Sequence, residues 1–173
     1  MKINISNYIF IKDNFLSDME CDKLIDFYHK NKDKIVTKNN YIFCYMQPNK
    51  SLTKKLNKIP SLYIEKYPEA NITVDKWYLE ELRIKHFKPK NSFDNWHSEH
   101  QVSTPLRMLA LQIYLSSHRC GTKFYRYETI KSEKGRLAIW PAYFTHTHKG
   151  QVCPDNLNRF ILSGYYRLRN ESI

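Results

Sequence analysis

The stretch FDNWHSEHQVS, residues 93–103, places His97, Glu99 and His100 within four consecutive positions. Imidazole nitrogens and carboxylate oxygens are both ligands of divalent transition metals. In an extended segment, residues i and i+2 point to the same side, so His97 and Glu99 can reach one ion while His100 points away. In a helix, His97 would pair with His100 instead. The Pro, Asn, Ser and Asp residues of 88–95 favour a loop or a strand edge, and we therefore expect the first arrangement.

Two ligands from one short segment need a third from elsewhere. A second histidine pair, His146 and His148, lies in YFTHTHKG (143–150), directly after the apolar run RLAIWP. One of these histidines with the HxE pair would make a 2-His-1-carboxylate facial triad, which leaves metal positions open and is typical of non-haem Fe(II) oxygenases. An HxE pair alone arises often by chance. A metal site is favoured by the order of the parts along the chain, which is HxE, a strand, RCGT, a second strand, a histidine and Arg159.

Helical signals come first in the chain, and strand signals follow. Ser17 and Glu20 form a capping box that predicts a helix start. A second helical stretch is expected over 51–67, kinked or split at Pro60. From about residue 73, short apolar runs separated by turn residues indicate a sandwich or barrel. The runs that we predict as strands are 77–87, 107–116, 135–141 and 159–168.

These signals predict one α+β domain over residues 1–173, with a helical part at about 15–68 and a β core at about 73–170. The length suits a single core of roughly 100–200 residues. The net charge of +11 comes from 28 Lys and Arg against 17 Asp and Glu, but these basic residues are scattered and predict a solvated basic surface.

The cysteines and the apolar runs limit the class of protein. Cys21, Cys44, Cys120 and Cys153 lie far apart without a CxxC pair, so we expect them to be reduced and buried. No long apolar segment indicates a signal peptide or a membrane span. We expect a cytoplasmic protein without membrane contact.

Taken together, these motifs resemble the 2-oxoglutarate and Fe(II)-dependent oxygenases, in particular their prolyl 4-hydroxylase-like branch. The resemblance covers about residues 8–168. It rests on five segments: NYIFIKDNFLSDMECDKLIDF, HFKPKNSFDNWHSE, LQIYLSSHRCGTKF, GRLAIWPAYFTHTHKG and NRFILSGYYRL. It implies a double-stranded β-helix, a jelly-roll or cupin-like barrel, with the N-terminal helices packed on the outer sheet.

The resemblance also implies roles for individual residues. His97, Glu99 and His148 would hold the metal, because the family's spacing to its basic residue favours His148 over His146. Arg159 would bind the distal carboxylate of 2-oxoglutarate, where a planar guanidinium fits best. The hydroxyls of Tyr114 and Ser163 fall where relatives direct hydroxyls at the same carboxylate. Ser163 lies four residues after Arg159, on the same face of the strand.

Two positions depart from the family's pattern. Glu99 stands where the family usually has aspartate, and its side chain is one methylene longer. The family's GGT turn is Cys120-Gly121-Thr122 here, which reduces backbone freedom at the turn.

The implied activity is hydroxylation of an unactivated C–H bond, most consistent with a peptidyl proline, with release of succinate and CO2. The implied cofactors are Fe(II), 2-oxoglutarate and O2, with ascorbate as a reductant, and the implied partner is a peptide or protein substrate. Two alternatives stay open. One is a non-catalytic cupin-like module that binds a metal or a ligand. The other is a nucleic-acid demethylase of the same superfamily, which the +11 charge would suit.

Overall fold

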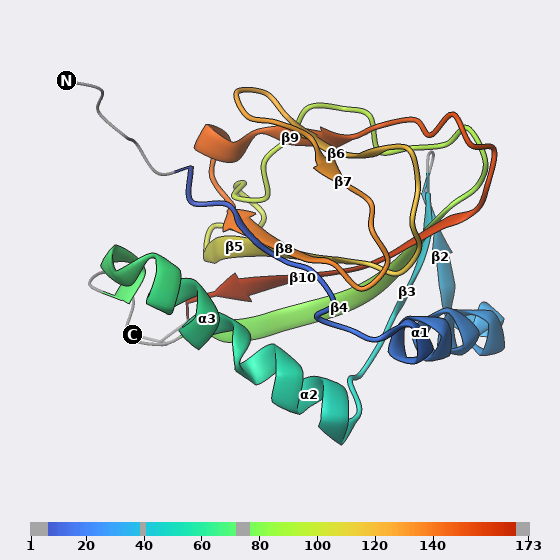
Figure 1. Ribbon diagram of the computed structural model, residues 1–173, viewed down its shortest axis with the longest axis horizontal. Helices are drawn as coiled ribbons and strands as arrows, with labels where there is room; N and C mark the ends of the chain where they lie inside the picture. The colour runs from blue at the N-terminus through green and yellow to red at the C-terminus, as the bar shows by residue number, and fades with distance from the viewer. Residues whose placement is uncertain (1–6, 39–40, 72–76, 169–173) are drawn as a thin grey trace.

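Two antiparallel β-sheets and three α-helices make up the computed structural model, which describes residues 7–38, 41–71 and 77–168 (Figure 1). The larger sheet has the strand order β1-β8-β5-β10-β4-β3-β2, and the smaller one has the order β7-β6-β9. The strands of the larger sheet are β1 (Phe10–Lys12), β2 (Ile35–Thr37), β3 (Ile42–Tyr45), β4 (Tyr78–Phe87), β5 (Arg107–Tyr114), β8 (Leu137–Pro141) and β10 (Arg159–Arg167). Those of the smaller sheet are β6 (Gly121–Phe124), β7 (Ile130–Lys131) and β9 (His148–Gly150).

The helices form where the sequence predicts them. Helix α1 (Asp18–Lys30) begins at Ser17, whose hydroxyl accepts from the Glu20 backbone N–H at 3.3 Å while the Glu20 carboxylate accepts from the Ser17 N–H at 2.8 Å. This confirms the capping box. The second stretch is split into α2 (Lys50–Asn57) and α3 (Ile59–Lys66), with Pro60 in the first turn of α3. Among the described residues, no helix is both long enough and apolar enough to cross a membrane.

The short 3-10 helices are η1 (Lys32–Lys34), η2 (Pro68–Asn71) and η3 (Phe144–His146).

The four predicted strands are confirmed as β4, β5, β8 and β10. Strands β2, β3, β6, β7 and β9 were not predicted. Each has two to four residues, too few for an alternating pattern to stand out from a loop. The β core expected over 73–170 extends beyond the described chain at 73–76 and 169–170.

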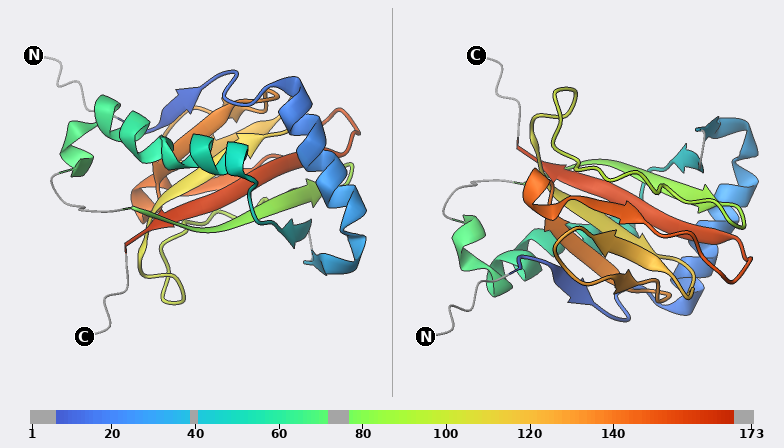
Figure 2. Two further views of the ribbon diagram at one scale, coloured as in Figure 1. Left: turned by 90° about the horizontal axis from the view of Figure 1, so that it is seen from below. Right: turned by 90° about the horizontal axis from the view of Figure 1, so that it is seen from above.

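The two faces of the larger sheet carry different contacts. Leu82 and Ile84 of β4 belong to the core cluster that includes buried residues of α1, α2 and α3. Phe87 of the same strand belongs to a second cluster, which includes Phe124 and Ile130 of the smaller sheet. The helices therefore cover one face and the smaller sheet faces the other (Figure 2). Arg83 and Lys85 of β4 alternate with Leu82 and Ile84, and they therefore point into the space between the sheets.

The prediction for the cysteines is wrong in one respect. Cys120, just before β6, and Cys153, after β9, form a disulfide across 33 residues. Pairing of β6 with β9 brings the two segments together, and no local spacing could reveal that contact. Cys21 and Cys44 are free and buried, as expected.

Candidate metal centre

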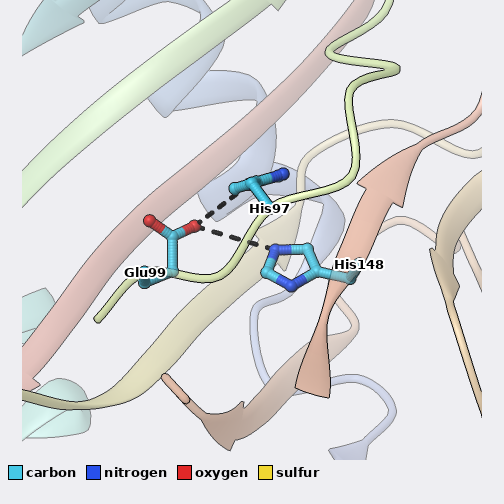
Figure 3. A group of neighbouring side chains, drawn as sticks. All are labelled: His97, Glu99 and His148. Atoms are coloured by element: carbon cyan, nitrogen blue, oxygen red, sulfur yellow. Dashed lines mark ion pairs between the residues drawn. The ribbon is translucent and has the colours of Figure 1, made fainter. Parts of the chain in front are cut away.

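Three side chains converge between the two sheets (Figure 3). His97 Nε2 lies 3.4 Å from Glu99 Oε1, and His148 Nε2 lies 3.7 Å from the same oxygen. One ligand atom from each residue lies within 4.8 Å of the others, which is the spacing of a group that could share one ion. The structure thus brings together the three residues that the sequence analysis selected.

The backbone fixes this convergence. His97 and His148 form a β-bridge, in which the His97 N–H donates to the His148 carbonyl at 3.0 Å and the His148 N–H donates back at 2.9 Å. The Glu99 N–H donates to the Ala142 carbonyl at 2.9 Å. The extended geometry from 97 to 99 directs both side chains to one side, as alternation requires.

Each histidine ring is oriented by a backbone carbonyl. Nδ1 of His97 lies 2.9 Å from the Asn95 carbonyl oxygen, and Nδ1 of His148 lies 2.9 Å from that of His146. A carbonyl can only accept, so each Nδ1 carries a proton and each Nε2 is left to face the space that a metal ion would occupy. Ligand histidines in metal sites are commonly held in this way.

The pKa values of Glu99 and His148 are shifted in the directions that favour binding of a cation. Burial favours a raised pKa for Glu99, but the contacts with His148 and His97 outweigh burial and hold its pKa well below the usual value. Burial lowers the pKa of His148 and so favours its neutral, ligating form. An ionised carboxylate beside neutral imidazole suits a divalent metal.

The neighbouring histidines lie outside this group. His146 is buried, with Nε2 at 2.7 Å from the Asn7 carbonyl oxygen and Nδ1 at 2.9 Å from the Thr145 hydroxyl. Its ring nitrogens are therefore both engaged. His100 contacts the Tyr143 ring, with centroids 4.5 Å apart. The geometry favours His148 over His146 as the third ligand.

A pocket opens beside the three side chains and includes Arg159 and Ser163 of β10. Arg159 donates to Ser92 Oγ, the Gln151 carbonyl and Cys120 Sγ, each at 3.1 Å. Within the described chain, Arg159 Nε and Ser163 Oγ are buried without a hydrogen-bond partner. Both atoms are thus free to meet a polar ligand.

Tyr114 lies behind this pocket. Its hydroxyl donates to Thr122 Oγ1 at 2.8 Å, and Thr122 lines the pocket where Tyr114 does not. Burial raises the pKa of Tyr114 to about 12. Thr122 was missed as a pocket residue, although it occupies the last position of the RCGT turn that the sequence analysis identified.

A second group of metal-ligating types is His118, Cys153 and Asp155. Cys153 is in the disulfide, and both ring nitrogens of His118 have partners, Asp155 Oδ2 at 3.0 Å and Ser116 Oγ at 2.9 Å. This group is therefore a weaker site for a metal than His97, Glu99 and His148.

No family model matches the sequence, and no curated protein sequence matches it. Solved structures do match. A viral collagen prolyl hydroxylase, vCPH, from Paramecium bursaria Chlorella virus-1 in complex with 2OG aligns with a TM-score of 0.75 and 21% identity, over 94% of this chain and 97% of that chain.

A Pseudomonas putida prolyl-4-hydroxylase aligns with a TM-score of 0.75 and 12% identity, over 95% of both chains. A prolyl hydroxylase from Trichoplax adhaerens, in complex with a hypoxia inducible factor peptide fragment, aligns with a TM-score of 0.67 and 11% identity, over 94% of this chain and 84% of that chain. The resemblance to the prolyl 4-hydroxylase-like branch is thereby confirmed at the level of the fold.

Proposed function

We propose that the protein is a 2-oxoglutarate- and Fe(II)-dependent dioxygenase of the prolyl 4-hydroxylase-like branch. It hydroxylates an unactivated C–H bond and releases succinate and CO2. The observation that carries this proposal is the convergence of His97 Nε2, Glu99 Oε1 and His148 Nε2 beside a pocket that contains a buried arginine. A fold shared with prolyl hydroxylases supports it.

The proposal includes the architecture of the core. The two facing sheets fit a double-stranded β-helix, a jelly-roll or cupin-like barrel, with the helices packed on its outer sheet. We treat residues 1–173 as a single domain.

The donor set fits Fe(II). Two neutral imidazoles and one carboxylate on one side of an ion leave the opposite side open, and hard and borderline ligands of this kind suit iron. Bound there together with 2-oxoglutarate, Fe(II) would supply the activation of O2, with ascorbate as an external reductant. His97, Glu99 and His148 hold the ion, and their Nδ1 and backbone contacts keep them in place.

Arg159 and the nearby hydroxyls bind the co-substrate. The Arg159 guanidinium and Ser163 Oγ offer unsatisfied donors to a carboxylate, and charge-assisted hydrogen bonds of this kind are the stronger ones. Tyr114 acts through Thr122, because its hydroxyl donates to that side chain rather than to the pocket. Phe87 supports the guanidinium, with its ring centroid 4.5 Å away.

Among the lining residues, Phe93 and Trp140 give the pocket apolar walls. Such walls exclude water from the reacting centre. We propose a peptide or protein as substrate and a peptidyl proline as the target. Two of the similar structures support this choice, since one is a collagen prolyl hydroxylase and another holds a peptide fragment.

The +11 charge is the observation that favours the second candidate, a nucleic-acid demethylase. That activity requires polynucleotide binding that weakens steeply with salt.

For location we propose the cytoplasm, without membrane contact.

The test is 2-oxoglutarate turnover, measured as succinate formation, with proline-containing peptides, free amino acids and methylated oligonucleotides. We expect turnover with Fe(II) that a proline-containing peptide stimulates. Stimulation by the methylated oligonucleotides alone would select the demethylase. Absence of Fe(II)-dependent turnover under every condition would leave the non-catalytic cupin-like module.

A further inference from the structure

Strand β4 presents two cations to the space between the sheets. Arg83 and Lys85 alternate with Leu82 and Ile84, which are buried toward the helices, so their side chains point to the pocket side and line it. Arg107 and Arg159 line the same pocket. Among its described lining residues, Glu99 is the one acid. Counted over its lining residues alone, the pocket carries a net positive charge before a metal binds.

Two of these cations have acidic partners. The Arg107 guanidinium donates to the Glu80 carboxylate at 2.6 and 3.0 Å and to Glu81 at 3.2 Å. Arg83 forms an ion pair with Glu81. These contacts give both guanidinium groups a counter-charge within the protein, although Arg83 Nε has no hydrogen-bond partner among the described residues.

Lys85 is different. Within the described chain, its ammonium has no hydrogen bond or ion pair, and its closest characterised contact is the Tyr41 ring, whose centroid lies 5.5 Å from Nζ. Lys85 is partly exposed where it lines the pocket, and the cation–π contact offsets only part of the hydration that its ammonium loses there. Burial accordingly lowers the pKa of Lys85, while attraction by Glu99 acts to raise it.

A bound metal would remove even that attraction. In the proposed enzyme, Fe(II), Glu99, doubly charged 2-oxoglutarate and Arg159 together carry no net charge. The charge of Lys85 is then left without a counter-charge among the described residues of the pocket. A cation that has lost part of its hydration is stabilised by pairing, so the Lys85 ammonium offers a binding point for an anionic group that arrives with the substrate.

The walls around Lys85 indicate where that anion lies. The Tyr41 ring contacts Phe93 at 5.7 Å between centroids, and Phe93 contacts the His97 ring at 4.4 Å. An apolar wall thus runs from the Lys85 ammonium to His97 of the candidate metal centre. A substrate whose carbon skeleton packs on this wall can reach the metal at one end and Lys85 at the other.

We propose that the substrate carries a carboxylate close to the carbon that is hydroxylated, and that Lys85 binds this carboxylate. The inference rests on the proposed function, because it places the reacting carbon at the metal. The carboxylate can belong to a free amino acid or to an acidic residue beside the target in a peptide.

Matched probe pairs test the proposal. Protein loaded with Mn(II) and 2-oxoglutarate is titrated by calorimetry with L-proline against L-prolinamide, and with acetylated Pro-Asp against acetylated Pro-Asn peptides. We expect the acid of at least one pair to bind about tenfold more tightly than its amide, since a charged hydrogen bond contributes about 1.5 kcal/mol or more. The pair that shows the preference identifies the source of the carboxylate.

Three variants locate the effect. Lys85→Met should abolish the preference without changing the affinity for 2-oxoglutarate, whereas Lys85→Arg should retain most of it and so show that the site still folds. Lys12→Met, an exposed lysine of β1, is the matched control and should behave as wild type. Equal affinity of acid and amide in both pairs, or a preference that survives in Lys85→Met, would overturn the proposal. Loss of 2-oxoglutarate affinity in Lys85→Met would also overturn it, because Lys85 would then hold the co-substrate.

Failure of the proposed function gives a different result. Wild-type protein would then bind neither Mn(II) nor 2-oxoglutarate, and the same pairs are titrated on the metal-free protein. If the acid still binds more tightly than its amide to the metal-free protein, and Lys85→Met removes that difference, then the carboxylate site exists although the protein is not a dioxygenase. No preference in that titration would reject both.

Discussion

Single residues in the candidate site are oriented by backbone contacts rather than by each other. The carbonyls of Asn95 and His146 fix the rings of His97 and His148, and the Thr104 hydroxyl donates to the Glu99 carbonyl at 2.7 Å. Glutamate in place of the family's aspartate is compatible with this arrangement, because its longer side chain reaches the space between the two Nε2 atoms.

The first prediction concerns Arg159. Burial lowers its pKa to about 10, so it remains charged at neutral pH and can bind a carboxylate. Arg159→Met should raise the KM for 2-oxoglutarate by about 10- to 100-fold, since one or two charged hydrogen bonds are lost at about 1.5 kcal/mol or more each. Succinate formation against 2-oxoglutarate concentration measures this.

The matched control is Arg126→Met, at an exposed arginine, which should leave the KM unchanged. An unchanged KM in Arg159→Met would assign the co-substrate carboxylate to another cation of the pocket.

At the level of elements, the amphipathic strand β4 links the helices to the site. Arg83, Lys85 and Phe87 line the pocket, whereas Leu82 and Ile84 between them pack against the helices. Alternation in the sequence predicts that strand. It does not show that the polar face is enclosed, because the smaller sheet that covers it is built from strands of two to four residues. The sequence placed Lys85 on the polar side of a strand predicted to be half-buried, and it gave no further sign that this side lines a pocket.

The second prediction concerns His86, which joins α1 to the larger sheet. Its Nδ1 lies 3.1 Å from the Tyr28 hydroxyl, its Nε2 lies 2.8 Å from Asn158 Oδ1, and its ring stacks on Phe160 with centroids 4.5 Å apart. Burial lowers the pKa of His86, so the folded state binds a proton less readily than the unfolded chain.

The stabilisation from neutral His86 is therefore present above the unfolded pKa of about 6.5 and is lost as the pH falls below it. The free energy of unfolding of the metal-free protein should decrease from pH 7.5 to pH 5.5, and His86→Gln should reduce that difference. Urea denaturation at the two pH values measures it. The same pH dependence in both proteins would contradict the assignment to His86.

At the level of the whole molecule, long-range pairing assembles the site. The candidate ligands come from the segment before β5 and from β9, while Arg159 comes from β10. The order of these parts along the chain indicated a resemblance to prolyl 4-hydroxylases, and the similar structures confirm that resemblance at the level of the fold. The disulfide and the third ligand could not be derived from spacing alone. Both depend on how β6 and β9 pair, and sequence periodicity carries no information about that contact.

The third prediction concerns the disulfide. Cys120 and Cys153 close a loop of 33 residues, and a cross-link of this kind typically adds about 2–4 kcal/mol, in the chain-entropy account by restricting the unfolded chain. Cys120→Ser should lower the free energy of unfolding by about that amount without reductant and by much less with it. Urea denaturation with and without dithiothreitol measures the difference.

Cys44→Ala is the control, because Cys44 is free and its effect should not depend on reductant. If reductant leaves the wild-type protein unchanged, the two cysteines are thiols in solution, as a cytoplasmic location would favour.

The most direct test of the account is the visible spectrum after anaerobic addition of Fe(II) and 2-oxoglutarate. If His97, Glu99 and His148 hold the iron and 2-oxoglutarate chelates it, a weak charge-transfer band should appear in the wild type and in His146→Gln. The band should be absent in His148→Ala and Glu99→Ala, with circular dichroism confirming that the variants fold. A wild-type protein without the band, or a band that survives in His148→Ala and disappears in His146→Gln, would contradict the proposed metal centre.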